Sequence, residues 1–199
     1  EDHELEIYPR RMPNKTKAEG YKAYTPMEDL VPNPADFGAG YRIHCTGLVH
    51  DETGFPSGSP KITEQTIKRL HEKIMRVQDE ITHYDEFFMD DAEIAVVAFG
   101  GTARTAYAAV EAARRAGQKV GMIRIMTIWP FADKVMQKLA QRVKGILVPE
   151  MNYGQYVREV ERAVAGMAHV VSLPKYNTEV FTPDEIKQGI EKLAAEVSR

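Results

Sequence analysis

The chain has 199 residues, a hydrophobic content of 43% and a formal net charge of -3. This length fits one large domain or two small ones, the hydrophobic content is that of an ordinary globular protein, and the charge excludes a strongly basic nucleic-acid binder. The single cysteine, Cys45, excludes a disulfide framework and any multi-cysteine zinc or iron–sulfur site built by this chain alone. It favours a reducing, cytoplasmic location, and the lack of a long apolar run predicts no membrane span.

Residues 1–60 are expected to form an extended arm. Most of the 11 prolines of the chain fall in this segment, and proline lacks the backbone donor that a long helix or a central strand requires. Large side chains suited to packing on another surface are Tyr8, Tyr21, Tyr24, Phe37, Tyr41, Ile43, Leu48 and Phe55. We therefore expect the arm to wrap a partner domain, with a flexible linker as the alternative. The sequence starts at Glu1 without a methionine or a signal peptide, which suggests a fragment or a processed chain.

Residues 61–91 are expected to form an amphipathic helix followed by an acidic connector. Thr63 is a suitable N-cap, and apolar residues recur at helical spacing at Ile67, Leu70, Ile74, Val77 and Ile81. This pattern predicts one helix of roughly 20 residues that ends near Thr82, with a charged face toward solvent. The acidic segment 84–91 then leads into the compact part of the chain.

Residues 92–199 predict a doubly wound α/β domain. Apolar runs at 93–99, 120–126, 145–150 and 169–173 indicate strands, which alternate with helical segments at 102–116, 131–143 and 153–165. A last helix is expected to start at Thr182, with Pro183 at its first position and Glu185 in a capping box. Helices between continuous apolar strands predict a mainly parallel sheet covered on both faces, and right-handed crossovers favour the strand order 2-1-3-4.

The first candidate site lies where the strand order reverses, because ligands of open α/β sheets bind there, beyond the carboxyl ends of the strands. Its two lips are Gly100, Gly101 and Thr102 on one side and Glu150, Asn152 and Gln155 on the other. The glycines and the helix start after them would suit an anion, but the segment lacks both G-x-G-x-x-G and a Walker lysine. The alternatives are a tight turn packed on a neighbour at the first lip, and a polar helix cap or an interface contact at the second.

The second candidate site is a dense polar cluster within residues 42–52. Its members are Arg42, His44, Thr46, Gly47, His50, Asp51 and Glu52, next to Cys45. Such residues can bind a metal, act as an acid–base pair or, for the cysteine, serve as a nucleophile. No helix fixes their spacing, however, so a structured loop that fastens one domain to another is favoured. Further along the chain, Met126 and Trp129 indicate core or interface positions rather than a cofactor site.

The order of motifs along the chain resembles that of the α subunits of 2-oxoacid:ferredoxin oxidoreductases. Residues 21–24 (YKAY) and 38–56 (GAGYRIHCTGLVHDETGFP) are similar to the arm that follows the pyrimidine-binding domain in that family. Residues 128–131 (IWPF) and 148–155 (VPEMNYGQ) are similar to its C-terminal domain, which is related to the C-terminal domain of transketolase. The resemblance covers nearly the whole chain and looks closest to the 2-oxoglutarate and branched-chain oxoacid members.

The resemblance implies a part in the coenzyme A-dependent oxidative decarboxylation of a 2-oxoacid, with 2-oxoglutarate as the expected substrate. In that family thiamine diphosphate with magnesium carries the chemistry, and iron–sulfur clusters pass the electrons to ferredoxin. The pyrimidine-binding motif, the diphosphate-binding motif and every cluster cysteine are absent from this sequence. We therefore expect the C-terminal part of an α subunit, with no catalytic or cofactor-binding residue of its own and no activity alone. Its implied partners are the remaining thiamine-side domain and the β subunit, with ferredoxin and coenzyme A reached through the complex.

Three other interpretations stay open at this point. The chain could be a non-catalytic interaction module that shares only the doubly wound fold, or a regulatory domain that binds a small ligand or nucleotide at the strand-order reversal. A related transketolase-like or dehydrogenase C-terminal domain fits the predicted sheet but not the motif from His44 to Pro56.

Overall fold

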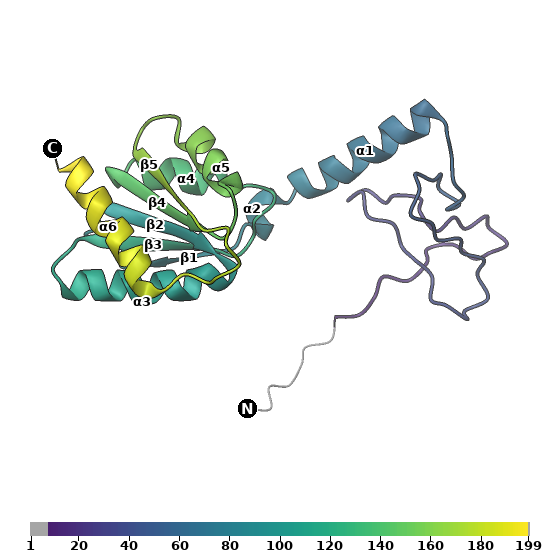
Figure 1. Cartoon of the computed structure of the whole chain (residues 1–199). Helices are drawn as coiled ribbons and strands as arrows, with labels where there is room; N and C mark the ends of the chain where they lie inside the picture. Colours follow the sequence, from purple (N-terminus) through teal and green to yellow (C-terminus); the bar gives the residue numbers. More distant parts are fainter. Residues whose placement is uncertain (1–7, 199) are drawn as a thin grey trace. The chain divides into compact units, whose positions relative to one another are not determined.

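The computed structural model describes residues 8–198, which divide into two compact units. Unit 1 extends to Val77, and unit 2 starts at Gln78. In Figure 1, unit 1 holds the purple and blue loops and helix α1 (Pro60–Met75), and unit 2 holds the sheet with the helices that cover it.

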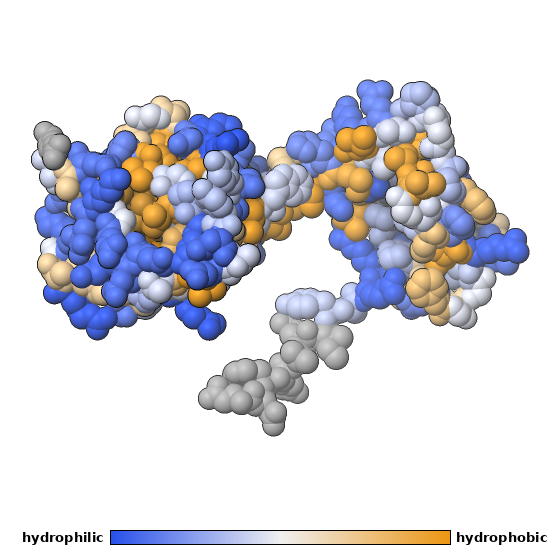
Figure 2. Space-filling model, in the orientation of Figure 1, coloured by the Kyte–Doolittle hydropathy of each residue, from blue (hydrophilic) through white to orange (hydrophobic). Residues whose placement is uncertain are grey.

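Unit 1 is built mostly from turns. Within residues 8–59 the backbone forms no helix or strand, and its only β-sheet pairings are two isolated β-bridges, Pro26 with Pro32 and His50 with Pro56. Hydrophobic side chains remain on its surface (Figure 2), and Phe37 is 86% exposed. The described part of this unit therefore lacks a large apolar core of its own.

Helix α1 is shorter than the sequence predicts, and it begins earlier. Its N-cap is Ser59 with a proline at the first position, whereas the expected cap, Thr63, lies inside the helix and donates its hydroxyl to the carbonyl of Ser59 at 3.1 Å. The helix ends at Met75, and a separate turn, α2 (Gln78–Ile81), follows in unit 2. The prediction of one continuous helix to Thr82 is therefore wrong. The backbone N–H of Val77 turns back to the carbonyl of Ile74, which tightens the last turn and ends the helix.

Unit 2 contains a sheet in the order β1-β3-β2-β4-β5. Its strands are β1 (Tyr84–Phe87), β2 (Ile94–Phe99), β3 (Val120–Ile125), β4 (Gly145–Glu150) and β5 (His169–Pro174). The last four are mutually parallel, and their arrangement confirms the predicted order 2-1-3-4. All residues of β4 are buried, as expected for a strand inside a covered parallel sheet.

The acidic segment expected to be a connector supplies the fifth strand. Strand β1 pairs antiparallel with β3, with Tyr84 opposite Ile125 and Phe87 opposite Met122. Its two carboxylates face arginines: Asp85 pairs with Arg124, and Glu86 contacts Arg142 of the α4–β4 connection at 2.8 Å. These ion pairs let an acidic, polar segment form an edge strand.

Helices cover both faces of the sheet, as predicted. Helices α3 (Gly100–Arg115) and α6 (Pro183–Val197) pack with Val96 in one core cluster, and α4 (Asp133–Ala140) and α5 (Gln155–Val164) pack with Val97 in the other. Neighbouring residues of β2 thus point to opposite faces. None of the helices within residues 8–198 is both long and apolar enough to cross a membrane.

Candidate functional site

The first candidate site is the carboxyl edge of the sheet. On the side of Glu150 and Asn152, side chains of the chain itself accept hydrogen bonds from the backbone N–H groups at the start of α5. Glu150 ends β4 and is fully buried. Its carboxylate accepts hydrogen bonds from the backbone N–H groups of Tyr156 at 2.8 Å and Val157 at 3.0 Å. The Asn152 side-chain oxygen accepts from the N–H groups of Gly154 at 2.9 Å and Gln155 at 3.1 Å.

These four bonds satisfy the N–H groups that the first turn of α5 would otherwise leave free. The negative charge of Glu150 also faces the positive end of the helix dipole. A phosphate or carboxylate ligand therefore has no free donors at this helix start. The interpretation of Glu150 and Asn152 as a polar helix cap is confirmed, while the side chain of Gln155 stays exposed.

Tyr156, which the sequence did not single out, lies behind this cap. Burial raises the pKa of its hydroxyl well above the ordinary value, and the charge of Glu150 raises it further. The ring packs against Phe99 and Phe131, with centroids 4.8 and 5.3 Å away. Its buried hydroxyl has no hydrogen-bond partner within residues 8–198. The raised pKa keeps this group protonated, so it can donate a proton in a hydrogen bond but is unsuited to act as a base.

The other lip is open. Helix α3 has no side-chain cap, and a Cβ atom at Gly100 or Gly101 would meet no atom within 4 Å. Thr102 is buried on the first turn. A cavity of about 410 Å³ opens beside this turn, and its lining includes Gly100, Arg104 and Arg124. The two sides of the candidate site therefore differ: the start of α3 has no side-chain cap, whereas the start of α5 is capped by Glu150 and Asn152.

The second candidate site folds as a structured loop in unit 1. The carboxylate of Glu52 contacts Lys22 at 3.4 Å and accepts a hydrogen bond from the hydroxyl of Thr25 at 3.0 Å. The backbone carbonyl of Glu52 accepts a hydrogen bond from the N–H of Tyr24 at 3.0 Å. Asp51 accepts from the backbone N–H of Thr53 at 2.8 Å. The two motifs of the arm, 21–24 and 38–56, are thus hydrogen-bonded to each other.

Aromatic contacts complete this loop. His50 packs against Tyr24 with centroids 4.2 Å apart, and His44 stacks on Phe55 at 4.6 Å. Thr46 accepts from the N–H of Leu48 at 3.2 Å, whereas Arg42 and Gly47 lie exposed.

Beside the loop, a cavity of about 550 Å³ is lined by residues that include Lys22, Glu52 and Arg69. Among the described residues no group of three or more histidine, cysteine, aspartate or glutamate side chains is arranged to hold a metal ion.

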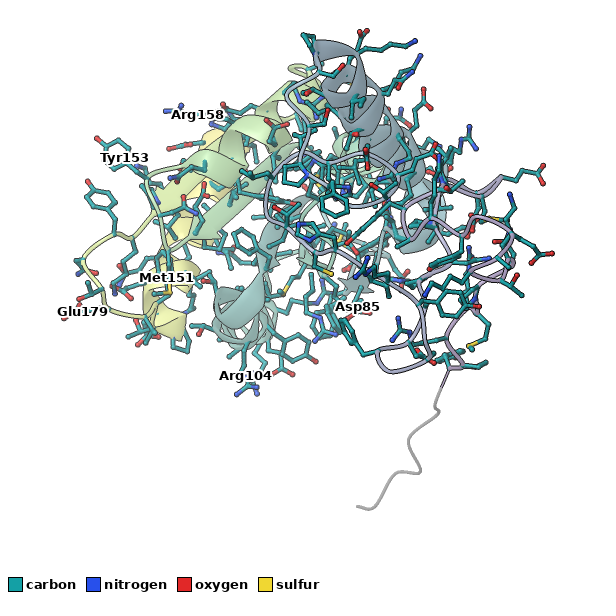
Figure 3. All side chains as sticks on the ribbon, turned by 90° about the vertical axis from the view of Figure 1, so that its right-hand side faces the viewer. Asp85, Arg104, Met151, Tyr153, Arg158 and Glu179 are labelled. Carbon is teal, nitrogen blue, oxygen red and sulfur yellow. The ribbon has the colours of Figure 1, made fainter. Side chains whose placement is uncertain are left out.

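Exposed apolar side chains on the carboxyl edge are the feature that sequence reasoning missed. We call them the edge patch, defined as Met126, Ile128, Trp129, Met151, Tyr153, Tyr176 and Val180. Figure 3 labels Met151 and Tyr153 in the loop after β4 and Glu179 in the loop after β5. Trp129 is 61% exposed and Met126 50% exposed, so of the two alternatives predicted for these residues the core is excluded and an interface position remains.

The loop after β5 is held by an ion pair and by hydrogen bonds at the start of α6. Lys175 donates to both carboxylate oxygens of Glu185, at 2.8 and 2.9 Å, and to the carbonyl of Val180 at 3.0 Å. Thr182 and Glu185 form the capping box that the sequence predicts. The backbone N–H of Lys175 also donates to the carbonyl of Glu150 at 2.9 Å, which ties this loop to β4.

Acidification is expected to weaken this network through Glu185. Hydrogen bonds from Lys175, and then from the Thr182 backbone, lower the pKa of its carboxyl from 4.5 to about 2. Because the folded-state pKa is depressed, the carboxylate contributes its full stability above pH 4.5 and loses it as the pH falls toward 2. Urea denaturation across this range should show a smaller loss of stability for Glu185→Gln than for the unchanged chain. An identical pH dependence in both proteins would contradict the assignment.

Comparison with known proteins assigns the class of unit 2. Residues 92–186 match the family model of the pyruvate:ferredoxin oxidoreductase core domain II. The chain is 40% identical over 190 residues to the 2-oxoglutarate synthase subunit KorA of Methanothermobacter thermautotrophicus. This match covers 95% of the chain and 50% of that subunit. It is 33% identical over 129 residues to the ketoisovalerate oxidoreductase subunit VorB of the same organism, covering 65% of this chain and 36% of VorB.

A solved structure shares the fold. The 2-oxoglutarate:ferredoxin oxidoreductase from Magnetococcus marinus, with 2-oxoglutarate, coenzyme A and succinyl-CoA bound, superposes with a TM-score of 0.76 at 23% identity, over 94% of this chain and 33% of that chain. The chain is a homologue of the KorA-type α subunits of 2-oxoacid:ferredoxin oxidoreductases, as its motifs predict. It spans about half the length of the KorA relatives that it matches.

Proposed function

We propose that the chain is the assembly part of the α subunit of a cytoplasmic 2-oxoacid:ferredoxin oxidoreductase that acts on 2-oxoglutarate. The observation that carries this proposal is the 40% identity to KorA over 95% of the chain. The whole enzyme would convert the 2-oxoacid and coenzyme A to acyl-CoA and CO2, with reduction of ferredoxin. This chain would supply surfaces that hold the catalytic parts together, and no catalytic residue.

Unit 1 supports a role in assembly. Its loops are ordered by internal hydrogen bonds, yet Phe37, Leu48 and Phe55 remain 60% or more exposed. The apolar stripe of α1 is only partly covered, because none of the residues of this helix is buried and Ile67 is 61% exposed. An ordered segment with uncovered aromatic and aliphatic groups is typical of one that packs on another protein surface. The remaining thiamine-side domain and the β subunit are the partners we propose.

The residues of this chain do not fit the cofactors of the implied enzyme. Iron–sulfur clusters need several thiolates, and the chain has only Cys45. Thiamine diphosphate needs a magnesium ion and donors for its diphosphate. Residues 8–198 offer no group of three metal ligands for that ion, and of the two helix starts at the candidate site that of α5 is already capped by Glu150 and Asn152, which leaves only the uncapped start of α3. We therefore assign these groups, and the steps that they carry, to other parts of the complex.

Reconstitution tests the proposal. The chain is mixed with the remaining α region and the β subunit of the same organism, and ferredoxin reduction is followed with 2-oxoglutarate and coenzyme A. We expect activity only when the chain is present, and none from the chain alone. Removal of residues 1–60 should lower the rate by at least about tenfold, since the catalytic parts would be held less precisely. Equal activity without the arm would refute its role, and full activity without the chain would refute the proposal.

A further inference from the structure

The edge patch holds most of the exposed large apolar side chains in the described part of unit 2, and all of its residues lie at one edge of the sheet. Its residues lie in the three loops that follow β3, β4 and β5, and parallel strands end at the same edge of a sheet. Their exposure ranges from 42% at Met151 to 70% at Val180. Tyr153 and Tyr176 join two of these loops, with ring centroids 4.8 Å apart. Within the described part of unit 2, the other such side chains are Phe88 and Met167.

The loops that carry the edge patch are held by hydrogen bonds. After β3, the N–H groups of Met126 and Thr127 both donate to the carbonyl of His83, and Gln78 donates to the carbonyl of Phe131 at 3.0 Å. The loops after β4 and β5 are held by Glu150, Asn152 and Lys175, as described above. A surface fixed in this way loses little conformational entropy when it is covered.

The composition of this edge is that of a protein interface. Tyrosine, tryptophan, methionine and arginine are enriched at interfaces. Tyrosine, tryptophan and arginine also account for a large share of the residues that dominate the binding energy. Arg104 and Arg158, both labelled in Figure 3, are exposed and make no ion pair or hydrogen bond within residues 8–198. A partner that presents carboxylates to these two guanidinium groups would complement them. The caps on α5 leave no free donors for an anion at that helix start, which adjoins Met151 and Tyr153 of the edge patch.

We propose that the edge patch binds the remaining region of the α subunit, the part of KorA that has no counterpart in this chain. This inference rests on the proposed function. The KorA relatives are about twice as long as the segment matched here, since the match covers 50% of the subunit. A half-subunit of that size is large enough to form a domain. Two parts of one polypeptide also meet at a high effective concentration, which favours an interface between them over one with a separate chain.

The only tryptophan of the chain, Trp129, lies in the edge patch and reports directly on its burial. The full chain is prepared with 5-fluorotryptophan, which gives a single fluorine resonance by NMR. The probe is the unlabelled remaining α region of the same organism. We expect the resonance to shift and to lose its sensitivity to solvent as that region is added, and the titration gives a dissociation constant.

Two substitutions and a matched control locate the interface. Tyr153→Glu and Tyr176→Glu, at positions 68% and 64% exposed, should each weaken binding by at least about tenfold. Met167→Glu introduces the same charge at a position 48% exposed, between α5 and β5 on the amino edge, and should leave the dissociation constant unchanged. Equal urea midpoints for all the variants would show that none acts by unfolding the chain. An equal loss of binding for Met167→Glu would overturn the inference.

The outcomes separate this inference from the proposed function. A Trp129 resonance that does not respond to the α region overturns the inference, even if reconstituted activity shows that the proposed function holds. A response without any activity supports the interface and counts against the proposed function. Line broadening that depends on the concentration of the chain alone, and is removed by Tyr153→Glu, would make a second copy the occupant. A response to the β subunit alone would assign the patch to that subunit. Either of these last results overturns the inference.

Discussion

Glu150→Ala is expected to lower the free energy of unfolding of the chain by roughly 3 kcal/mol or more. The substitution leaves the N–H groups of Tyr156 and Val157 buried without partners, and each such group costs about 1–3 kcal/mol. It also removes a fully buried side chain and leaves a void next to Tyr156. Urea denaturation followed by circular dichroism measures the loss.

Asn152→Ala is the matched control, because Asn152 caps the same helix but is only half-buried. Water can reach the N–H groups that it leaves, so the expected loss is about 1 kcal/mol. Glu150→Gln should fall between the two, since the amide keeps one acceptor oxygen and turns a donor toward a backbone N–H. If Glu150→Ala costs no more than Asn152→Ala, the buried carboxylate is not the main support of α5.

Gly54→Ala is expected to unfold the loop that joins the two motifs of unit 1. Gly54 has a φ angle of +92°, and a Cβ atom there would lie 2.2 Å from the carbonyl oxygen of His44 and 2.8 Å from the ring of Tyr24. Because the first of these atoms belongs to the backbone, the loop cannot yield by a side-chain rotation alone. We expect a local loss of about 2 kcal/mol or more, from the steric conflict together with the unfavourable φ.

Hydrogen exchange of two backbone amides measures this effect. The N–H of Asp51 donates to the carbonyl of Phe55 at 3.1 Å, and that of Ser57 donates to Val49 at 2.9 Å. Protection of both should fall at least about tenfold in Gly54→Ala. Gly58→Ala is the control, since a Cβ atom there meets nothing within 4 Å and should leave protection unchanged. Unaltered protection in Gly54→Ala would show that the loop adopts another conformation.

Hydrophobic periodicity predicted most of unit 2. The four parallel strands and the capping box at Thr182 follow from apolar runs and turn residues along the chain, and the order of the strands follows from the right-handedness of crossover connections. Strand β1 was missed because the segment Tyr84–Phe87 is short and half acidic, so nothing in its pattern indicates a strand. It forms a strand by pairing with β3, supported by the ion pairs to Arg124 and Arg142, and these partners come from distant parts of the sequence. Such long-range pairs cannot be read from local pattern.

The sites were predicted less completely. Glu150 and Asn152 were placed at the correct edge, and their role as caps was one of two alternatives, because spacing alone does not show where a carboxylate points. The sequence left a core and an interface position open for Trp129, since an apolar residue after a buried strand has the same local pattern whether or not other residues cover it. The pairing of 21–24 with 38–56 was also beyond the sequence, since it depends on turns that carry no periodicity.

The position of β1 determines where the chain can be shortened. Strand β1 pairs with β3, so a polypeptide that begins at residue 92 would leave the backbone N–H and carbonyl groups of β3 open along one side. Open strand edges recruit strands from other molecules, which leads to aggregation. It would also lose Asp91, the partner of Arg114 at 2.8 Å. A soluble preparation of this domain should therefore begin before Tyr84, since the acidic strand shields the sheet from self-association.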